Sequence, residues 1–426
     1  RQPNPAENVV CPPCPLLIAL LLLPIGVSAD GILLFPKTAL APYELGLIVN
    51  DSDPLSREIA AYYRQRRAIP AQNVIHVRFP PGNAALAPDT FEDLYQTVQD
   101  KTPARVQAFA LAWARPYKVG CMSITSAIAT GYDQRYCATE RLPDKPCGVT
   151  AQSPYFASAS RAPQRDFNLR PSMLLAAETL DDAKRLIDRG IAADGSLPRG
   201  TAYLLSTSDA SRTVRDRGFA EIEQVLGSAL RVEVLKQDSL QDRQDVLFYF
   251  TGKARVAHLD TLEFVPGAVA DHLTSAGGHM KGPQQGGQMS SLRWLEAGAT
   301  GSYGTVIEPC NFPTKFPNPG LLMQFYLRGE SLIEAYWKSV AWPGEGLFIG
   351  EPLAAPYSRP LLRFEGSSLD IAAGLLRPGR YALQMAANPV GPYRDTGRTL
   401  QVGGKGGGMR LSGLDKRYYR LQHAAE

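Results

Sequence analysis

Cys310 is the residue of this sequence whose surroundings best fit a nucleophile. It lies in the segment EPCNFP, among turn-forming residues and close to Glu308. A catalytic cysteine needs a thiolate, which a histidine or a helix N-terminus can stabilise. His258 lies 52 positions upstream (310 − 258), so the two residues could be nucleophile and general base of a cysteine-dependent hydrolase. The alternative is a disulfide between Cys310 and another cysteine.

Histidines gather in one stretch, since three of the five lie between positions 258 and 279. Asp271 and His272 are adjacent, and Asp271 could orient an imidazole in the same centre as Cys310 and His258. Neighbouring side chains on a helix do not face each other, so this pairing requires a turn of the backbone. Zinc binding would also use histidines, but the sequence has no H-x-x-x-H or H-E-x-x-H spacing. We therefore expect no metal centre of that kind and no cofactor.

Carboxylates follow two apolar runs that are typical of buried strands, at 43–50 and 201–206. In open parallel sheets, ligands bind beyond the carboxyl ends of the strands. Glu308 follows the small-residue segment 298–306, so the candidate ligand-binding residues are Asp51, Asp53, Asp209 and Glu308. With His258 or His272, the three aspartates could also hold the metal of a hydrolase. The competing interpretation is that Asp53 and Asp209 only cap helices.

The start of the sequence has the pattern of an export signal. Residues 15–27 read PLLIALLLLPIGV, and Ser28 and Ala29 follow. This apolar run suits a signal peptide with a Val-Ser-Ala cleavage pattern, whereas a membrane span needs about 20 apolar residues. We predict a signal peptide over 1–29, a mature chain from near Asp30, and a secreted or periplasmic location. No stable membrane anchor is expected after cleavage.

The cysteines point to an oxidising compartment. The C-x-x-C at 11–14 precedes the apolar run and would be removed with the signal peptide. The remaining four cysteines allow three pairings. Cys137 and Cys147 flank a loop that contains proline and arginine, which favours a local bridge between them. Cys121 and Cys310 would then form the second disulfide.

Composition excludes some classes of protein. With 44% hydrophobic and 20% charged residues, the chain is globular rather than disordered. The net charge of +4 is small for 426 residues, and the positive charges are scattered. The sequence therefore shows no basic patch of the kind that binds nucleic acid.

Strand-like and helix-like segments alternate along most of the chain, which predicts an α/β fold with a mainly parallel sheet and helices on both faces. The predicted strands are 43–50, 74–77, 106–113, 119–124, 172–177, 201–206, 232–235 and 246–250, and 298–306 forms a strand or a tight turn. The predicted helices are 53–67, 90–98, 179–190, 211–227, 267–274, 290–297 and 331–340.

The distribution of apolar, glycine and proline residues along the chain also predicts the domain organisation. One α/β domain, with one or two subdomains, covers 30–357, and a long loop at 127–170 is inserted in it. Short extended runs separated by Gly and Pro predict a small β module over 358–402. The Gly-rich segment that follows predicts a flexible tail over 403–426.

Several long motifs resemble a family of exported bacterial proteins. They are GIAADGSLPRGTAYLL, FVPGAVADHLTSAGG, GATGSYGTVIEPCNFPTKFP and EAYWKSV, and the resemblance covers nearly all of residues 43–357. It implies an exported globular protein and transfers no mechanism.

A second resemblance is to the gingipain and caspase-like cysteine peptidase fold. The shared order is an apolar strand (VLFYF) that ends at a glycine, a histidine region, a small-residue strand and a late helix, and the spacing of His258 from Cys310 is similar to the roughly 50 residues of caspases. In those peptidases a glycine follows the histidine, and the cysteine follows an alanine at the end of the next strand. Here Leu259 follows His258, and FVPGAVADH contains no cysteine. The resemblance therefore implies the fold more strongly than the activity.

Three functions remain open from the sequence. The first is a disulfide-stapled binding protein of the cell envelope or extracellular space, with a polymer or protein partner and no nucleic acid. The second is a peptidase-like hydrolase that uses Cys310 and His258. The third is a metal-dependent hydrolase that uses the aspartates.

Overall fold

The computed structural model describes residues 32–34, 38–137, 147–280, 287–358, 362–365, 368–371, 379–388, 391–402, 409–414 and 418–423. The predicted signal peptide and the C-x-x-C at 11–14 lie outside these residues. Within the described ranges, no helix is both long and apolar enough to cross a membrane.

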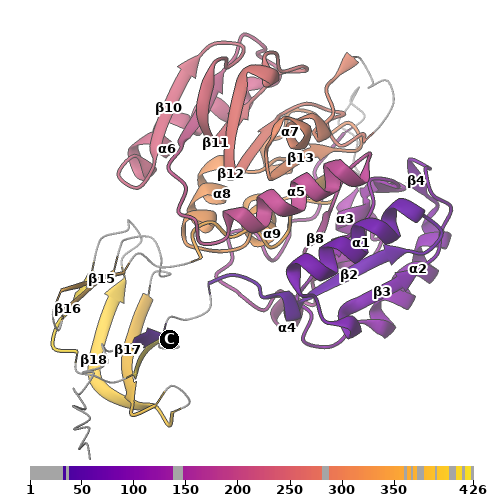
Figure 1. The fold of residues 1–426 in the computed structure, drawn as a ribbon. Helices are drawn as coiled ribbons and strands as arrows, with labels where there is room; N and C mark the ends of the chain where they lie inside the picture. The colour runs from indigo at the N-terminus through magenta and orange to yellow at the C-terminus, as the bar shows by residue number, and fades with distance from the viewer. Residues whose placement is uncertain are drawn as a thin grey trace, which may run out of the picture.

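A large sheet forms the centre of the α/β unit (Figure 1). Its strands pair in the order β10-β9-β11-β12-β13-β14-β8-β5-β2-β3. Neighbouring strands run parallel except β13 and β14, which are antiparallel. In chain order these strands are β2 (Leu45–Asn50), β3 (Val74–Val77), β5 (Ala108–Leu111), β8 (Ser172–Leu174), β9 (Thr201–Ser206), β10 (Arg231–Lys236), β11 (Arg243–Thr251), β12 (Leu262–His272), β13 (Gly301–Thr305) and β14 (Gly346–Gly350).

The antiparallel pairing of β13 with β14 divides this sheet into two parallel halves that run in opposite directions. One half holds β9 to β13, and the other holds β2, β3, β5, β8 and β14. The carboxyl ends of the two sets of strands therefore lie at opposite edges of the sheet. This reversal decides which candidate residues can meet.

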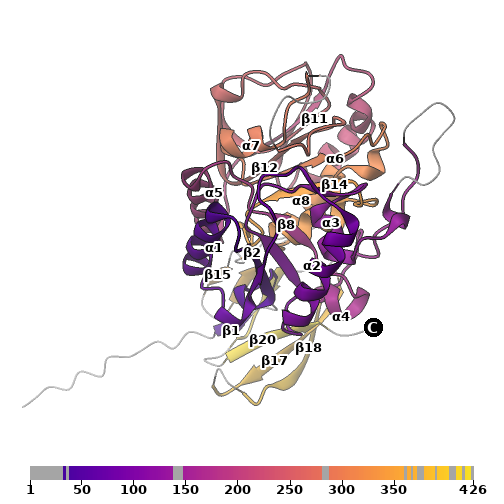
Figure 2. The ribbon, with the colours of Figure 1, turned by 90° about the vertical axis from the view of Figure 1, so that its right-hand side faces the viewer.

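Helices pack on both faces of the sheet. Val49 of β2 belongs to a buried cluster that includes side chains of α1, α6, α8 and α9, whereas the adjacent Ile48 belongs to one with α2, α3 and α7. The helices α1 and α5 lie side by side (Figures 1 and 2), where Tyr62 donates a hydrogen bond of 2.8 Å to Asp188. The helices are α1 (Pro54–Arg67), α2 (Pro88–Lys101), α3 (Ile124–Thr130), α4 (Pro163–Phe167), α5 (Leu180–Ala193), α6 (Phe219–Leu226), α7 (Leu292–Ala297), α8 (Pro319–Leu327) and α9 (Leu332–Ser339).

Two predicted helix starts are confirmed in atomic detail. The Asp53 side chain accepts a hydrogen bond from the Leu55 backbone N–H and caps α1. Ser331 and Glu334 form a capping box at the start of α9, where the sequence predicts a helix over 331–340. Both caps satisfy backbone N–H groups that a helix leaves without partners at its first turn.

Three segments differ from their predictions. The helix predicted at 267–274 is the second part of strand β12. The strand predicted at 119–124 is a short hairpin of β6 (Lys118–Val119) and β7 (Met122–Ser123), with β4 (Ala85–Leu86) beside β6, and α3 begins directly after it. The helix predicted at 211–227 divides into a 3₁₀ segment, Thr213–Gly218, and α6.

The C-terminal β module forms two small sheets around its own buried cluster, which includes Tyr381, Leu400 and Leu421. Figure 1 shows its strands grouped apart from the large sheet. Its strands are β1 (Ile32–Leu34), β15 (Leu362–Glu365), β16 (Ser368–Ile371), β17 (Gly379–Ala386), β18 (Arg394–Val402), β19 (Met409–Leu411) and β20 (Tyr418–His423).

This module corrects two predicted boundaries. β19 and β20 lie in the segment 403–426, which we expected to be a flexible tail, and both pair with other strands of the module. β1 precedes the α/β unit in sequence but pairs in parallel with β20. The first described strand therefore belongs to the same sheet as the last one.

The disulfides differ from the predicted pairing. The bridges join Cys121 to Cys137 and Cys147 to Cys310. The predicted local bridge between Cys137 and Cys147 is therefore wrong, and so is Cys121–Cys310. Disulfides of this kind indicate an oxidising compartment rather than the cytosol.

Candidate functional site

The reversal in the sheet separates the candidate carboxylates. Asp51 and Asp53 follow β2, whereas Asp209 follows β9 in the oppositely directed half. These residues therefore lie at opposite edges and do not form one ligand set. In the part of the chain that the structure describes, no group of three or more His, Cys, Asp or Glu side chains could hold a metal ion.

Each carboxylate at the edge of β2 has a local partner. Asp51 accepts from Nδ1 of His76 at 2.7 Å, and Arg78 lies 3.6 Å away. The hydrogen bond from His76 lowers the pKa of Asp51, with smaller contributions from neighbouring charges. Asp53 is the cap of α1, which is the alternative role that the sequence left open.

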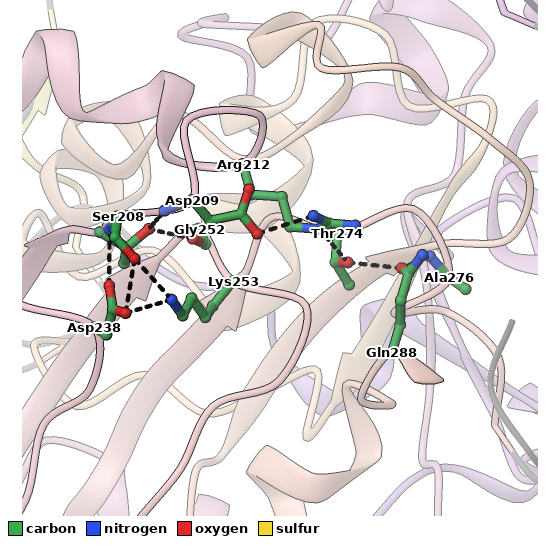
Figure 3. A network of polar contacts seen from close by, with 10 residues as sticks. Ser208, Asp209, Arg212, Asp238, Gly252, Lys253, Thr274, Ala276 and Gln288 are labelled. Carbon is green, nitrogen blue, oxygen red and sulfur yellow. Dashed lines mark hydrogen bonds and ion pairs between the residues drawn. The ribbon is translucent and has the colours of Figure 1, made fainter. Parts of the chain in front are cut away.

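At the opposite edge, polar side chains from separate loops converge beyond β9, β10 and β11 (Figure 3). The backbone N–H and the hydroxyl of Ser208 donate to the two oxygens of Asp238, at 2.7 and 2.8 Å. The Lys253 ammonium donates to Asp238 at 2.5 Å and to the Ser208 hydroxyl oxygen at 3.2 Å. These bonds, led by the one from Lys253, lower the pKa of Asp238 to about 2.

Serine and lysine at this distance raise the question of a nucleophilic serine. A lysine general base would have to be neutral, but Lys253 is here the cation of an ion pair. The low pKa of Asp238 makes its carboxylate a weak base as well. The cluster is thus arranged to hold three loops together and present a polar surface rather than to activate Ser208.

Arg212 forms a second set of contacts in the same view (Figure 3). Its guanidinium pairs with Asp209 at 2.9 Å and donates to the Thr274 hydroxyl at 3.0 Å. The Thr274 hydroxyl in turn donates to Oε1 of Gln288, which also accepts from the Ala276 backbone N–H. Asp209 therefore orients an arginine that joins the loop after β9 to the loop after β12.

Beneath this surface lies a buried ion pair. Arg215 donates to Asp271 at 2.6 Å and to the Thr251 carbonyl oxygen at 2.9 Å, and both side chains of the pair are nearly inaccessible. Burial raises the pKa of Asp271, and the nearby Arg215 offsets only part of that effect. Within the described residues, Arg215 Nε, Asp271 Oδ2 and Thr251 Oγ1 are buried without a hydrogen-bond partner. Incompletely satisfied polar clusters are rare in native cores and often mark functional sites.

His272 does not share a centre with Asp271. Successive strand residues point to opposite faces of a sheet, and His272 lies against Trp294 while Asp271 lies against Arg215. Trp294 Nε1 donates to His272 Nδ1 at 2.9 Å, and His272 Nε2 donates to the Met289 carbonyl oxygen at 3.1 Å. Burial lowers its pKa to about 4, so His272 is a neutral, fully bonded core residue.

The structure does not assemble the predicted cysteine centre. Cys310 is bonded to Cys147, and Glu308 accepts a hydrogen bond from the Cys310 backbone N–H. His258 is exposed in a left-handed conformation at the start of a short 3₁₀ segment. A sulfur in a disulfide has no thiolate, so the hydrolase interpretation lacks its nucleophile in this state.

A hollow of about 590 Å³ opens beside the buried ion pair. One wall is the loop that follows Cys310, and another is the segment that carries Arg215. This volume is within the range of small-molecule sites, which combine apolar walls with a few polar groups. We name it the Arg215 hollow.

Comparisons with known proteins give little more. No protein-family profile matches the chain, and no curated protein matches it significantly. Among solved structures, a chain titled "Structure of Protease" is similar, with a TM-score of 0.41 and 9% identity over 91% of this chain and 98% of that chain. Similarity of this degree does not carry an activity from one protein to another.

Sequence reasoning named Asp209 and Asp271 but missed the other residues that build this edge. Lys253 and Ser208 follow predicted strands, which was a usable signal, but neither Arg212 nor Arg215 stood out. Asp238 follows β10 and Lys253 follows β11, and their side chains pair across the end of β9, which lies between those two strands in the sheet. That order of strands is not visible in the chain order.

Proposed function

We propose that this chain is an exported, disulfide-stapled binding protein whose site lies at the carboxyl ends of β9, β11 and β12. The observation that carries the proposal is the bonded state of Cys310: the most plausible nucleophile of the sequence is a structural bridge. The charged groups at this edge are also matched in pairs, as in Lys253–Asp238 and Arg212–Asp209. Such an edge presents polar groups in fixed positions, which suits recognition.

The resemblance to gingipain and caspase-like peptidases supports the same location. In those peptidases the catalytic histidine and cysteine follow two successive strands, and β11 and β12 are neighbours here. The corresponding ends carry Lys253 after β11 and His272 within β12. The proposal is that a peptidase-like arrangement of strands, without a thiol at that edge, is used for binding a polymer or protein of the cell envelope.

The test is a map of the thiols in protein purified from an oxidising compartment. Native and reduced samples are treated with iodoacetamide, and the bridged peptides are identified by mass spectrometry. We expect no alkylation of Cys310 before reduction, and a peptide pair that joins Cys147 to Cys310. The Cys121–Cys137 bridge serves as the internal control for oxidation.

A peptide-hydrolysis assay completes this test. With a mixed fluorogenic peptide library, the mature protein should show no turnover, and Cys310→Ala should not differ from it. A free Cys310 that is alkylated rapidly, together with turnover that Cys310→Ala abolishes, would replace the binding proposal with a cysteine hydrolase.

A further inference from the structure

The Arg215 hollow has an apolar lining that a ligand could bury. Its walls come from four separate parts of the chain: the segment before α4, the 3₁₀ segment with α6, the stretch from the Cys310 bridge to the start of α8, and the end of α9. The main apolar side chains are Phe156, Ile222, Phe312, Phe316, Pro317 and Pro319. Aromatic rings and prolines give a large contact area with little loss of side-chain entropy.

The charged side chains that line the hollow are all positive. Arg215 and Arg217 line the hollow, and no Asp or Glu is among its lining residues. Asp271 pairs with Arg215 from behind, so Arg215 is largely neutralised. Arg217 is exposed, and no carboxylate within the described residues pairs with it. The uncompensated charge at the hollow is therefore positive and belongs to Arg217.

The wall formed by residues 311–318 is held in place before any ligand arrives. Lys315 within it forms a fully buried ion pair with Glu345 at 2.7 Å. The loop begins at the Cys147–Cys310 bridge and ends at Asn318, the N-cap of α8. A preformed wall lowers the ordering cost of binding.

We propose that the Arg215 hollow binds an organic carboxylate with an apolar body, such as the carboxyl terminus of an apolar peptide or a short fatty acid. The apolar body packs between the phenylalanine and proline side chains, and the carboxylate meets the Arg217 guanidinium at the rim. The ligand class rests on the proposed binding function, because it names what the same edge recognises.

Gly218 offers a way to block the hollow without disturbing the fold. It lines the hollow, and a Cβ built on it has no atom within 4 Å. Its φ of −97° suits any L-residue. Gly218→Phe should therefore fill the hollow while leaving the thermal midpoint of unfolding nearly unchanged.

The experiment measures the affinity of four probes by isothermal titration calorimetry with the full mature chain. Two are N-acetyl-leucyl-phenylalanine and octanoate, and the other two are their amides, which have the same apolar bodies without charge. We expect each favoured acid to bind roughly three- to tenfold tighter than its amide, which is modest because the arginine is exposed. Which acid binds distinguishes the peptide source from the fatty-acid source.

Three variants give the decisive comparison. Arg217→Gln should remove the preference for the acid, and Gly218→Phe should weaken acid and amide together by more than about tenfold. Arg64→Gln is the matched control. Arg64 is an exposed arginine of α1, the helix between β2 and β3, and those strands belong to the other half of the sheet. It should leave both affinities unchanged.

Three outcomes would overturn the inference. The first is equal affinity for acid and amide, and the second is a preference for the acid that survives Arg217→Gln. The third is an absence of binding by all four probes. None of these outcomes decides the proposed function, which depends on the separate thiol map and hydrolysis assay.

Discussion

The two disulfides should differ in their contribution to stability. Cys147–Cys310 closes a loop of 163 residues, whereas Cys121–Cys137 closes one of 16. In the chain-entropy description, these loops correspond to roughly 5 and roughly 3 kcal/mol of the free energy of unfolding at 25 °C. The loops do not overlap in sequence, so the two effects should be independent. Replacing both cysteines of a bridge by alanine should therefore cost about 2 kcal/mol more for Cys147–Cys310.

Urea unfolding of the oxidised proteins measures this difference. The wild type and the two double variants are compared at one pH, and the free energy of unfolding is extrapolated to water. The long-loop variant should have the lower midpoint. After reduction of all disulfides, the three proteins should converge, because the constraint on the unfolded chain is then absent from each.

Single variants check the pairing itself. Cys310→Ala should release the thiol of Cys147, and Cys121→Ala should release that of Cys137. If Cys310→Ala releases the thiol of Cys121 instead, the bridge described here is wrong. An equal cost for the two double variants, or a larger cost for the short loop, would refute the entropic reasoning.

Four other variants test the core, the site and the module. Burial lowers the pKa of His272 to about 4, so the unfolded chain binds a proton that the folded chain excludes. The free energy of unfolding should therefore fall by about 3 kcal/mol as the pH drops from 6.5 through 4. His272→Gln should flatten this part of the pH profile of stability measured by urea unfolding. Gly252→Ala places a Cβ 2.0 Å from the Arg212 carbonyl oxygen and should cost about 1–3 kcal/mol, whereas Gly218→Ala should shift the thermal midpoint little. Deleting 359–426 should leave the near-UV circular dichroism of the α/β unit intact, because the buried cluster of the module is separate; loss of that signal would show that the two parts fold together.

Local elements could be predicted where the pattern has one physical meaning. Asp53 before Pro54, and Ser331 three residues before Glu334, each mark a helix start, and both caps are present. Apolar runs such as VLFYF form buried strands of the large sheet. In these cases neighbouring residues alone decide the conformation.

The segment 267–274 shows why other elements could not be predicted. Ala268, Val269 and Ala270 are all fully buried, so β12 has neither the alternation of a half-exposed strand nor the stripe of an amphipathic helix. Small apolar residues with an adjacent Asp and His fit either conformation. Only the pairing of β12 with β11 on one side and β13 on the other makes it a strand.

Long-range pairing decided the candidate site, and the sequence does not contain it in readable form. β14 is a short run, GLFIG, and nothing in its residues states that it pairs antiparallel with β13. That one pairing makes the two halves of the sheet run in opposite directions. It therefore places Asp51 and Asp209 at opposite edges of the sheet. Likewise, four cysteines permit three pairings, and the fold selected one in which the predicted nucleophile is bonded.

The charge states of the side chains at this edge support the binding function that we propose. Catalysis needs a reactive group whose charge state is poised near the working pH. None of the three candidate groups meets this condition. Cys310 is held in a disulfide, burial lowers the pKa of His272, and the ion pair with Lys253 lowers the pKa of Asp238. The unmatched group that remains near the Arg215 hollow is Arg217, a permanent cation beside apolar walls. A permanent cation holds a ligand without exchanging a proton with it, which is consistent with the binding function that we propose for this edge.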